Sequence, residues 1–87
     1  MSAGGNSIPG DWQPGQSDAI AAFRYVAADE VLQIAYHHGR VVYDFPCPST
    51  MYNQFLHAAS RGRFVQNVMR PYARQQGWSR PAYPWPW

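Results

Sequence analysis

Apolar residues between positions 49 and 62 recur every three or four residues, which is the period of an amphipathic helix. The stripe consists of Met51, Tyr52, Phe55, Leu56 and Ala59. Ser49 or Thr50 suits the N-cap of such a helix, and Gly62 supplies a stop. We therefore expect a helix over residues 49–59 with one buried face.

A second helical pattern follows Gly62, and it is basic. At about 100° per residue, residues 63–74 separate into an apolar and a polar side. The apolar side holds Phe64, Val65, Val68, Met69 and Tyr72, and the polar side holds Arg63, Gln66, Asn67, Arg70 and Arg74. We expect a shorter helix over residues 63–70, which Pro71 ends or kinks because proline disrupts the helical hydrogen-bond ladder.

The period changes to two before residue 47, as in strands with one buried face. Residues 20–26 are rich in strand formers, and residues 32–36 and 41–45 alternate, up to Pro46 where a strand must end. Only short links join these segments. The pattern predicts an α+β fold, with a three-stranded antiparallel meander over residues 18–46 followed by the two helices, packed on one face of the sheet.

The two ends of the chain are poorer in core-forming residues. We expect a flexible arm over residues 1–16, the domain over residues 17–74, and a Pro/Trp-rich tail over residues 75–87 that leans toward polyproline II. Three roles remain open for the tail tryptophans: they fold back over the sheet, stack on bases, or dock into a partner protein. These tryptophans are Trp78, Trp85 and Trp87.

The chain of 87 residues holds a single cysteine, Cys47, so no intramolecular disulfide can stabilise it. Cys47 lies at the strand-to-helix corner, where we expect it to be buried and inert. The chain begins without a basic segment followed by an apolar run, and no stretch approaches the roughly 18 apolar residues of a membrane span. We expect a cytoplasmic monomer that does not contact membranes.

Charge is distributed unevenly, although the formal net charge is only +2. All five acidic residues precede residue 45, whereas five of the seven basic residues follow residue 60, and every basic residue is arginine. Arginine favours bidentate phosphate contacts, although an all-arginine chain can equally reflect genome composition. The sequence therefore predicts a phosphate-contacting row of Arg63, Arg70 and Arg74 on the second helix, with Arg61 at its entrance; the alternative is an ordinary solvated helix face.

Tyr43 and Phe45 add aromatic rings to this basic set. They lie two residues apart in the third predicted strand, so they share one face of the sheet. Such rings can stack on bases, as in sheet-based RNA binders, or they can belong to the core. Both interpretations remain open from the sequence.

Candidate chemistry is weak elsewhere in the chain. Asp44, His57 and Ser60 could nominally form a hydrolase triad, but no strained elbow surrounds the serine, which better suits the cap of the second helix. His37 and His38 would point to opposite faces of a strand, which does not suit a metal site. We predict a non-enzymatic protein without a metal or a cofactor.

One set of residues follows a known family pattern. The set consists of Ile20, Tyr25, Leu32, Ile34, Tyr36, Gly39, Tyr43, Asp44, Phe45, Pro48, Tyr52, Leu56, Ala58, Ser60, Gly62, Phe64 and Arg70. Over residues 17–72 it resembles the KTSC domain, which is named from the C-terminus of some lysyl-tRNA synthetases and also occurs as a stand-alone bacterial or phage protein. The spacing departs from the family by one residue on each side of the aromatic pair, so we expect a bulge in the third strand. The resemblance implies no established activity, and it implies RNA binding only through the synthetase context.

Two function classes follow from these features. In the first, the chain is an RNA- or nucleic-acid-binding module that uses the four arginines together with Tyr43 and Phe45. In the second, it is a protein-interaction adaptor, phage or prophage encoded, that uses the Trp-Pro tail or a sheet edge.

Overall fold

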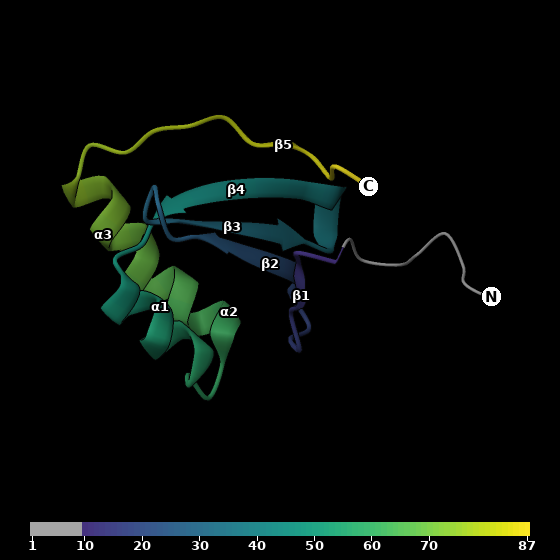
Figure 1. Ribbon diagram of the computed structural model, residues 1–87, viewed down its shortest axis with the longest axis horizontal. Coiled ribbons are helices and arrows are strands. Elements are labelled where there is room, and N and C mark those ends of the chain that lie inside the picture. The colour runs from purple at the N-terminus through teal and green to yellow at the C-terminus, as the bar shows by residue number, and fades with distance from the viewer. Residues whose placement is uncertain (1–9) are drawn as a thin grey trace.

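The computed structural model describes residues 10–87, which form an antiparallel sheet with helices on one side (Figure 1). The strands are β1 (Gln13–Pro14), β2 (Ile20–Val26), β3 (Val31–Tyr36), β4 (Val41–Pro46) and β5 (Tyr83–Pro84), in the spatial order β1-β2-β3-β4-β5. The meander β2-β3-β4 confirms the α+β prediction, but the prediction of three strands was wrong because the sheet has five. The two further strands come from the arm and the tail and are too short to show a period. Residues 1–9 of the predicted flexible arm lie outside the described residues.

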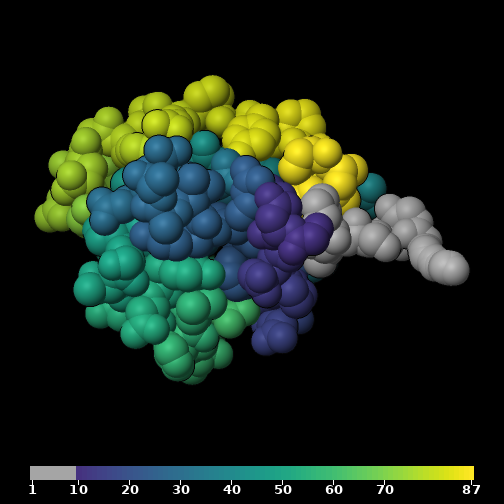
Figure 2. Space-filling model, viewed as in Figure 1, coloured from purple at the N-terminus to yellow at the C-terminus, as the bar shows by residue number. Residues whose placement is uncertain are grey.

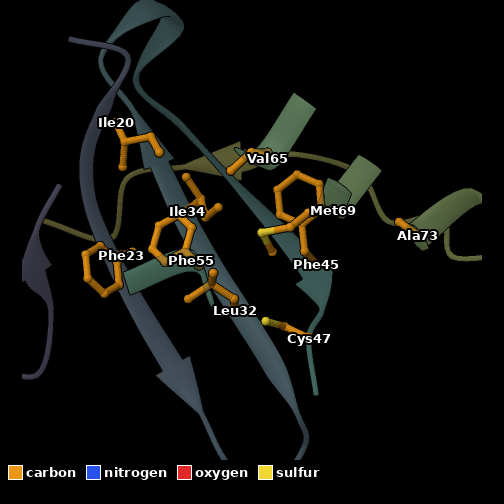
Figure 3. Close-up of a cluster of buried hydrophobic side chains, with 10 residues drawn as sticks. All are labelled: Ile20, Phe23, Leu32, Ile34, Phe45, Cys47, Phe55, Val65, Met69 and Ala73. Atoms are coloured by element: carbon orange, nitrogen blue, oxygen red, sulfur yellow. The ribbon is translucent and has the colours of Figure 1, made fainter. Parts of the chain in front are cut away.

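Alternation of side chains gives the sheet two different faces. Leu32 of β3 pairs with Phe45 of β4, and Ile34 pairs with Tyr43, so these apolar side chains share the face toward the helices. The core on this side contains ten buried side chains, drawn in Figure 3. They are Ile20, Phe23, Leu32, Ile34, Phe45, Cys47, Phe55, Val65, Met69 and Ala73.

The opposite face carries small side chains covered by aromatic residues from both ends of the chain. The small residues lie in register across three strands and are fully buried: Ala22, Ala35 and Val42. The aromatic residues packed with them are Trp12, Tyr83, Trp85 and Trp87. Figure 2 shows residues 10–16 beside the end of the tail. The rings of Trp12 and Trp87 meet edge to face, with their centroids 5.0 Å apart. The tail therefore folds back over the sheet, which is one of the three roles left open by the sequence.

The second helix is longer than predicted. α1 spans Ser49–Leu56, and after a short loop a continuous helix runs through α2 (Arg61–Phe64), a π turn (Val65–Met69) and α3 (Arg70–Gln75). The helix does not end at Pro71, which was one of the two predicted outcomes; it continues to Gln75 after a π turn that directly precedes α3. The π turn widens the hydrogen-bond ladder just before the proline, whose ring would otherwise clash with the carbonyl four residues earlier.

Of the three helix-end residues predicted from the sequence, two differ in the structure. Pro48 occupies the N-cap of α1 in place of Ser49 or Thr50, and no side chain caps this end. Gly62 lies inside α2 and does not stop α1. Ser60 caps the second helix as predicted, because its hydroxyl accepts a hydrogen bond from the Arg63 backbone N–H at 3.3 Å.

The expected bulge in β4 was also wrong. β3 and β4 pair without a register shift from Val31–Pro46 to Tyr36–Val41. The tight turn His38–Arg40 joins them, and in it Gly39 and Arg40 have left-handed φ values of 79° and 50°. We attribute the altered spacing to this turn, since the ladder itself is regular. The register shift of the sheet lies in β2 instead, between residues 20 and 22.

Candidate nucleic-acid interface

A hollow of about 240 Å³ lies between the C-terminal part of β4, α3 and the segment that follows α3. Its lining consists of Tyr43, Asp44, Phe45, Arg70, Ala73, Arg74, Trp78, Ser79 and Arg80, and we call it the basic hollow. Four of the six predicted binding residues meet here: Tyr43, Phe45, Arg70 and Arg74. The structure adds Trp78 and Arg80, which the sequence had not placed beside them.

The end of α3 directs Trp78 into the basic hollow. Gly77 has a left-handed φ of 67°, its N–H donates to the Arg74 carbonyl at 3.1 Å, and the Trp78 N–H donates to the Ala73 carbonyl at 2.9 Å. These bonds form a Schellman cap, which reverses the chain after the helix. The indole Nε1 of Trp78 then donates to the Asp44 carbonyl at 2.8 Å. A glycine just beyond a helical stripe is the sequence signal that could have placed Trp78 beside the helix.

Arg70 packs against aromatic rings of the sheet. Its guanidinium carbon lies 5.7 Å from the centroid of the Tyr43 ring and 6.0 Å from that of Phe45. Its Nε is buried and has no hydrogen-bond partner among the described residues. Burial raises the pKa of Tyr36, and the neighbouring Arg70 charge opposes that rise. Arg70 is therefore partly enclosed, in contrast to the predicted solvent-facing position.

The π turn explains why the predicted helix faces fail at this point. One extra residue in a helical turn rotates the following positions by about 100° relative to the preceding ones. Val68, predicted on the apolar side, is 36% exposed, whereas Ala73 is buried. A uniform helical period cannot anticipate this rotation.

Arg80 and Arg74 occupy different environments within the basic hollow. The Arg80 guanidinium carbon lies 4.1 Å from the centroid of the Trp78 ring, and Arg80 Nη1 lies 3.5 Å from a carboxylate oxygen of Asp44. Arg74 is exposed, and within residues 10–87 no ion pair involves it. The basic hollow therefore holds one enclosed, one paired and one solvent-accessible arginine.

Arg61 lies away from the basic hollow and joins parts of the fold. Its guanidinium donates to the carbonyl oxygens of Gly15 at 3.0 Å and Leu56 at 3.2 Å. The guanidinium carbon also lies 5.2 Å from the ring centroid of Phe23 and 5.5 Å from that of Phe55. Arg61 thus connects the β1–β2 loop, α1 and the core.

Arg63 is exposed and lines a broader hollow of about 710 Å³ beside the β1–β2 loop. It lies about 16 Å from Arg74 along the helix axis, at 1.5 Å per residue. The predicted row is not one exposed surface, because Arg61 donates to backbone carbonyls and Arg70 packs on Tyr43 and Phe45. Arg61 and Arg63 lie near one end of the second helix, and Arg70 and Arg74 lie near the other.

The sequence left open whether Tyr43 and Phe45 belong to the core or to a binding surface, and the structure gives a different answer for each. Phe45 is 5% exposed and belongs to the core. Tyr43 is half-buried, meets Tyr36 edge to face at 5.6 Å, and contributes to the lining of the basic hollow. Tyr43 thus packs against the core and is also accessible from the basic hollow.

A chain of hydrogen bonds ties the arm and the tail to the sheet. Arg24 donates to Asp11 at 2.6 Å and to Gln33 at 2.7 Å. The Gln33 amide donates to the Tyr83 hydroxyl at 3.1 Å, and that hydroxyl donates to Asp44 at 2.9 Å. Burial, together with the bond to Asp44, raises the pKa of Tyr83 to about 12. Asp44 thereby connects this network to the basic hollow. No local sequence motif predicts this connection.

The side chains considered for catalysis have other partners in the structure. The Nδ1 atom of His57 lies 2.8 Å from the Asn53 carbonyl, Ser60 caps the second helix, and Asp44 accepts from Tyr83. In the part of the chain that the structure describes, no cluster of three or more potential metal ligands occurs. Among the same residues, no helix has the length and apolar character needed to cross a membrane.

Cys47 should resist thiol reagents in the native protein. Its side chain is fully buried, and burial raises the pKa of the thiol to about 12, so the reactive thiolate is scarce at about pH 8. We expect a chromogenic disulfide reagent to label Cys47 completely in denaturant and only slowly under native conditions. Rapid stoichiometric labelling of the folded protein would contradict its placement in the core.

Comparisons with known proteins agree with this architecture. The KTSC domain model matches residues 16–72. A protein of Tsukamurella paurometabola is 32% identical over 62 residues, which cover 71% of this chain and 92% of that protein. The crystal structure of a KTSC domain protein from Yersinia pestis superposes with a TM-score of 0.61 at 28% identity, covering 66% of this chain and 80% of that chain. The chain belongs to the KTSC domain family.

Proposed function

We propose that this KTSC domain protein is a non-enzymatic module that binds nucleic acid, and RNA in particular, at the basic hollow. The observation that carries the proposal is the convergence of three arginines with the half-buried rings of Tyr43 and Trp78. A single acidic residue, Asp44, lies among them, so the lining carries a net positive charge. Positive concave surfaces attract polyanions, and aromatic rings beside them add stacking.

Arg74 is the arginine best suited to contact phosphate. It is exposed, and the two ion pairs among the described residues involve other arginines. Arginine binds phosphate oxygens in a bidentate geometry. Arg70, which packs on Tyr43 and Phe45, contributes its positive charge from a more enclosed position.

Replacing Arg74 by glutamine should weaken RNA binding and reduce its dependence on salt. Removing one phosphate-binding charge should lower the slope of log K against log salt by about 0.7 for a single strand. The measurement is fluorescence anisotropy of a labelled single-stranded RNA, titrated at several salt concentrations. Arg63→Gln is the matched control, because it removes the same charge from an exposed position at the other end of the helix.

The two variants separate a local site from general charge attraction. A larger decrease in affinity for Arg74→Gln than for Arg63→Gln supports binding at the basic hollow. Equal decreases would attribute binding to net charge and remove the site from this position. Unchanged affinity and slope in folded Arg74→Gln would contradict the proposal directly.

A protein-interaction adaptor is the second candidate, and the geometry supports it less. The tail packs on the chain itself, where the indole of Trp85 donates to the Tyr36 carbonyl at 3.2 Å. Pro14 and Pro84 lie in the two edge strands, where proline opposes the addition of a partner strand. Failure to bind RNA or DNA at low salt would nevertheless make the adaptor the leading candidate.

A further inference from the structure

Trp78 and Arg80 form a close cation–π pair within the basic hollow. The guanidinium carbon of Arg80 lies 4.1 Å from the centroid of the Trp78 ring. The Arg80 side chain nevertheless remains 52% exposed. Since one side of the guanidinium meets the indole, this exposure leaves its other side accessible to a ligand.

The pairing of Arg80 favours a neutral planar ligand over a phosphate at this position. The Asp44 carboxylate lies 3.5 Å from Arg80 and is only 14% exposed, so it offsets part of the arginine charge. A phosphate seated on Arg80 would also approach this carboxylate, and like charges repel more strongly where water is partly excluded. A base carries no such charge, and bases stack well on guanidinium planes.

The size of the basic hollow limits the ligand further. Its volume of about 240 Å³ is below the ~300 Å³ at which pockets for drug-sized ligands begin. Such a space suits one planar ring system and not a base pair. In a duplex the bases are already stacked and paired, so only a single strand presents a free base face.

We propose that the basic hollow takes one unstacked base of a single-stranded RNA, stacked on the accessible side of the Arg80 guanidinium, with a neighbouring phosphate at Arg74. This inference rests on the proposed function, and it names the structural class of nucleic acid and the contact that selects it. Trp78 and Arg80 lie beyond residues 16–72, so this contact comes from the tail and not from the part of the chain that matches the family model.

The experiment compares three labelled RNA probes on the full chain: octauridylate, an abasic analogue of the same length, and a 12-base-pair duplex. Stacking of one base is worth about 1–3 kcal/mol, so octauridylate should bind at least about fivefold more tightly than the abasic analogue. Arg80→Lys keeps the charge but removes the planar group, and it should abolish this ratio. Arg74→Lys keeps the phosphate contact as a point charge and should preserve the ratio, with thermal melting confirming that both variants fold.

The outcomes separate this inference from the proposed function. If none of the probes binds at low salt, the proposed function itself fails. If octauridylate and its abasic analogue bind equally with a clear salt dependence, nucleic-acid binding stands and base stacking is overturned. Tighter binding of the duplex than of the single strand would also overturn the inference. If Arg80→Lys does not fold, the comparison of the three probes on the native protein still tests whether a base stacks in the basic hollow.

Discussion

Replacing Phe55 by alanine should cost the protein a large share of its stability. Phe55 has no exposed surface, and its ring meets those of Phe23 at 5.1 Å and Phe64 at 6.2 Å edge to face. The Arg61 guanidinium, which joins the β1–β2 loop to α1, also lies against this ring at 5.5 Å. A buried Phe→Ala substitution costs about 3–5 kcal/mol, which is a large share of the roughly 5–15 kcal/mol that stabilises a domain.

Urea denaturation followed by circular dichroism measures this decrease in stability. Leu56→Ala is the matched control, because Leu56 lies next to Phe55 on α1 but is only half-buried, so its truncation should cost less. The two residues belong to the same predicted apolar stripe, and the structure shows that Phe55 is the more deeply buried of the two. A cooperative Phe55→Ala transition at the native midpoint would mean that the core is not centred on this ring.

Replacing Trp12 by alanine should cost about 3 kcal/mol, at the lower end of the range for buried aromatic residues. Trp12 is 6% exposed, meets the ring of Trp87 at 5.0 Å, and has the Arg24 guanidinium 5.3 Å from its centroid. Its removal would uncover Ala35 and its small neighbours on the sheet face. The free energy of unfolding of Trp12→Ala, compared with that of the exposed control Val68→Ala, tests this expectation.

A double-mutant cycle of Trp12→Ala with Trp87→Ala separates the energy of the contact between the two rings from the energy of burying each ring on the sheet. Aromatic pairs contribute about 0.5–1.5 kcal/mol beyond the area they bury, so the two truncations should cost less together than the sum of their separate effects. Additive effects would mean that the arm and the tail pack independently on the sheet. A Trp12→Ala change within about 0.5 kcal/mol of the native protein, as for ordinary surface positions, would place the arm outside the cooperative fold.

The central elements could be predicted because local periodicity determines them. Leu32, Ile34 and Phe45 occupy the face that a period of two assigns to them, and Phe55 occupies the buried side of a helical stripe. Burial of Cys47 also followed from its local position, since it lies at the corner between β4 and α1. These features depend on neighbours within a few residues, which the sequence displays directly.

The candidate site could be predicted only in part. Arg70, Arg74, Tyr43 and Phe45 were identified from their chemistry, and the fold brings them into one hollow. Their grouping with Arg80 depends on the Schellman cap and on the path of the tail, which long-range contacts decide. The predicted row failed because the π turn changes the helical phase between Arg63 and Arg70.

By itself, the sequence determined the strand and helix periods, the helix-side core, the uneven charge and the family to which the chain belongs. Only the tertiary structure decided what covers the second face of the sheet, because Trp12 and Trp87 lie at opposite ends of the chain and meet only after folding. It also decided the role of each arginine. The guanidinium group joins the β1–β2 loop to α1 at Arg61, packs on aromatic rings at Arg70 and stays exposed at Arg74. The surroundings of each arginine therefore determine whether its charge is available to a ligand.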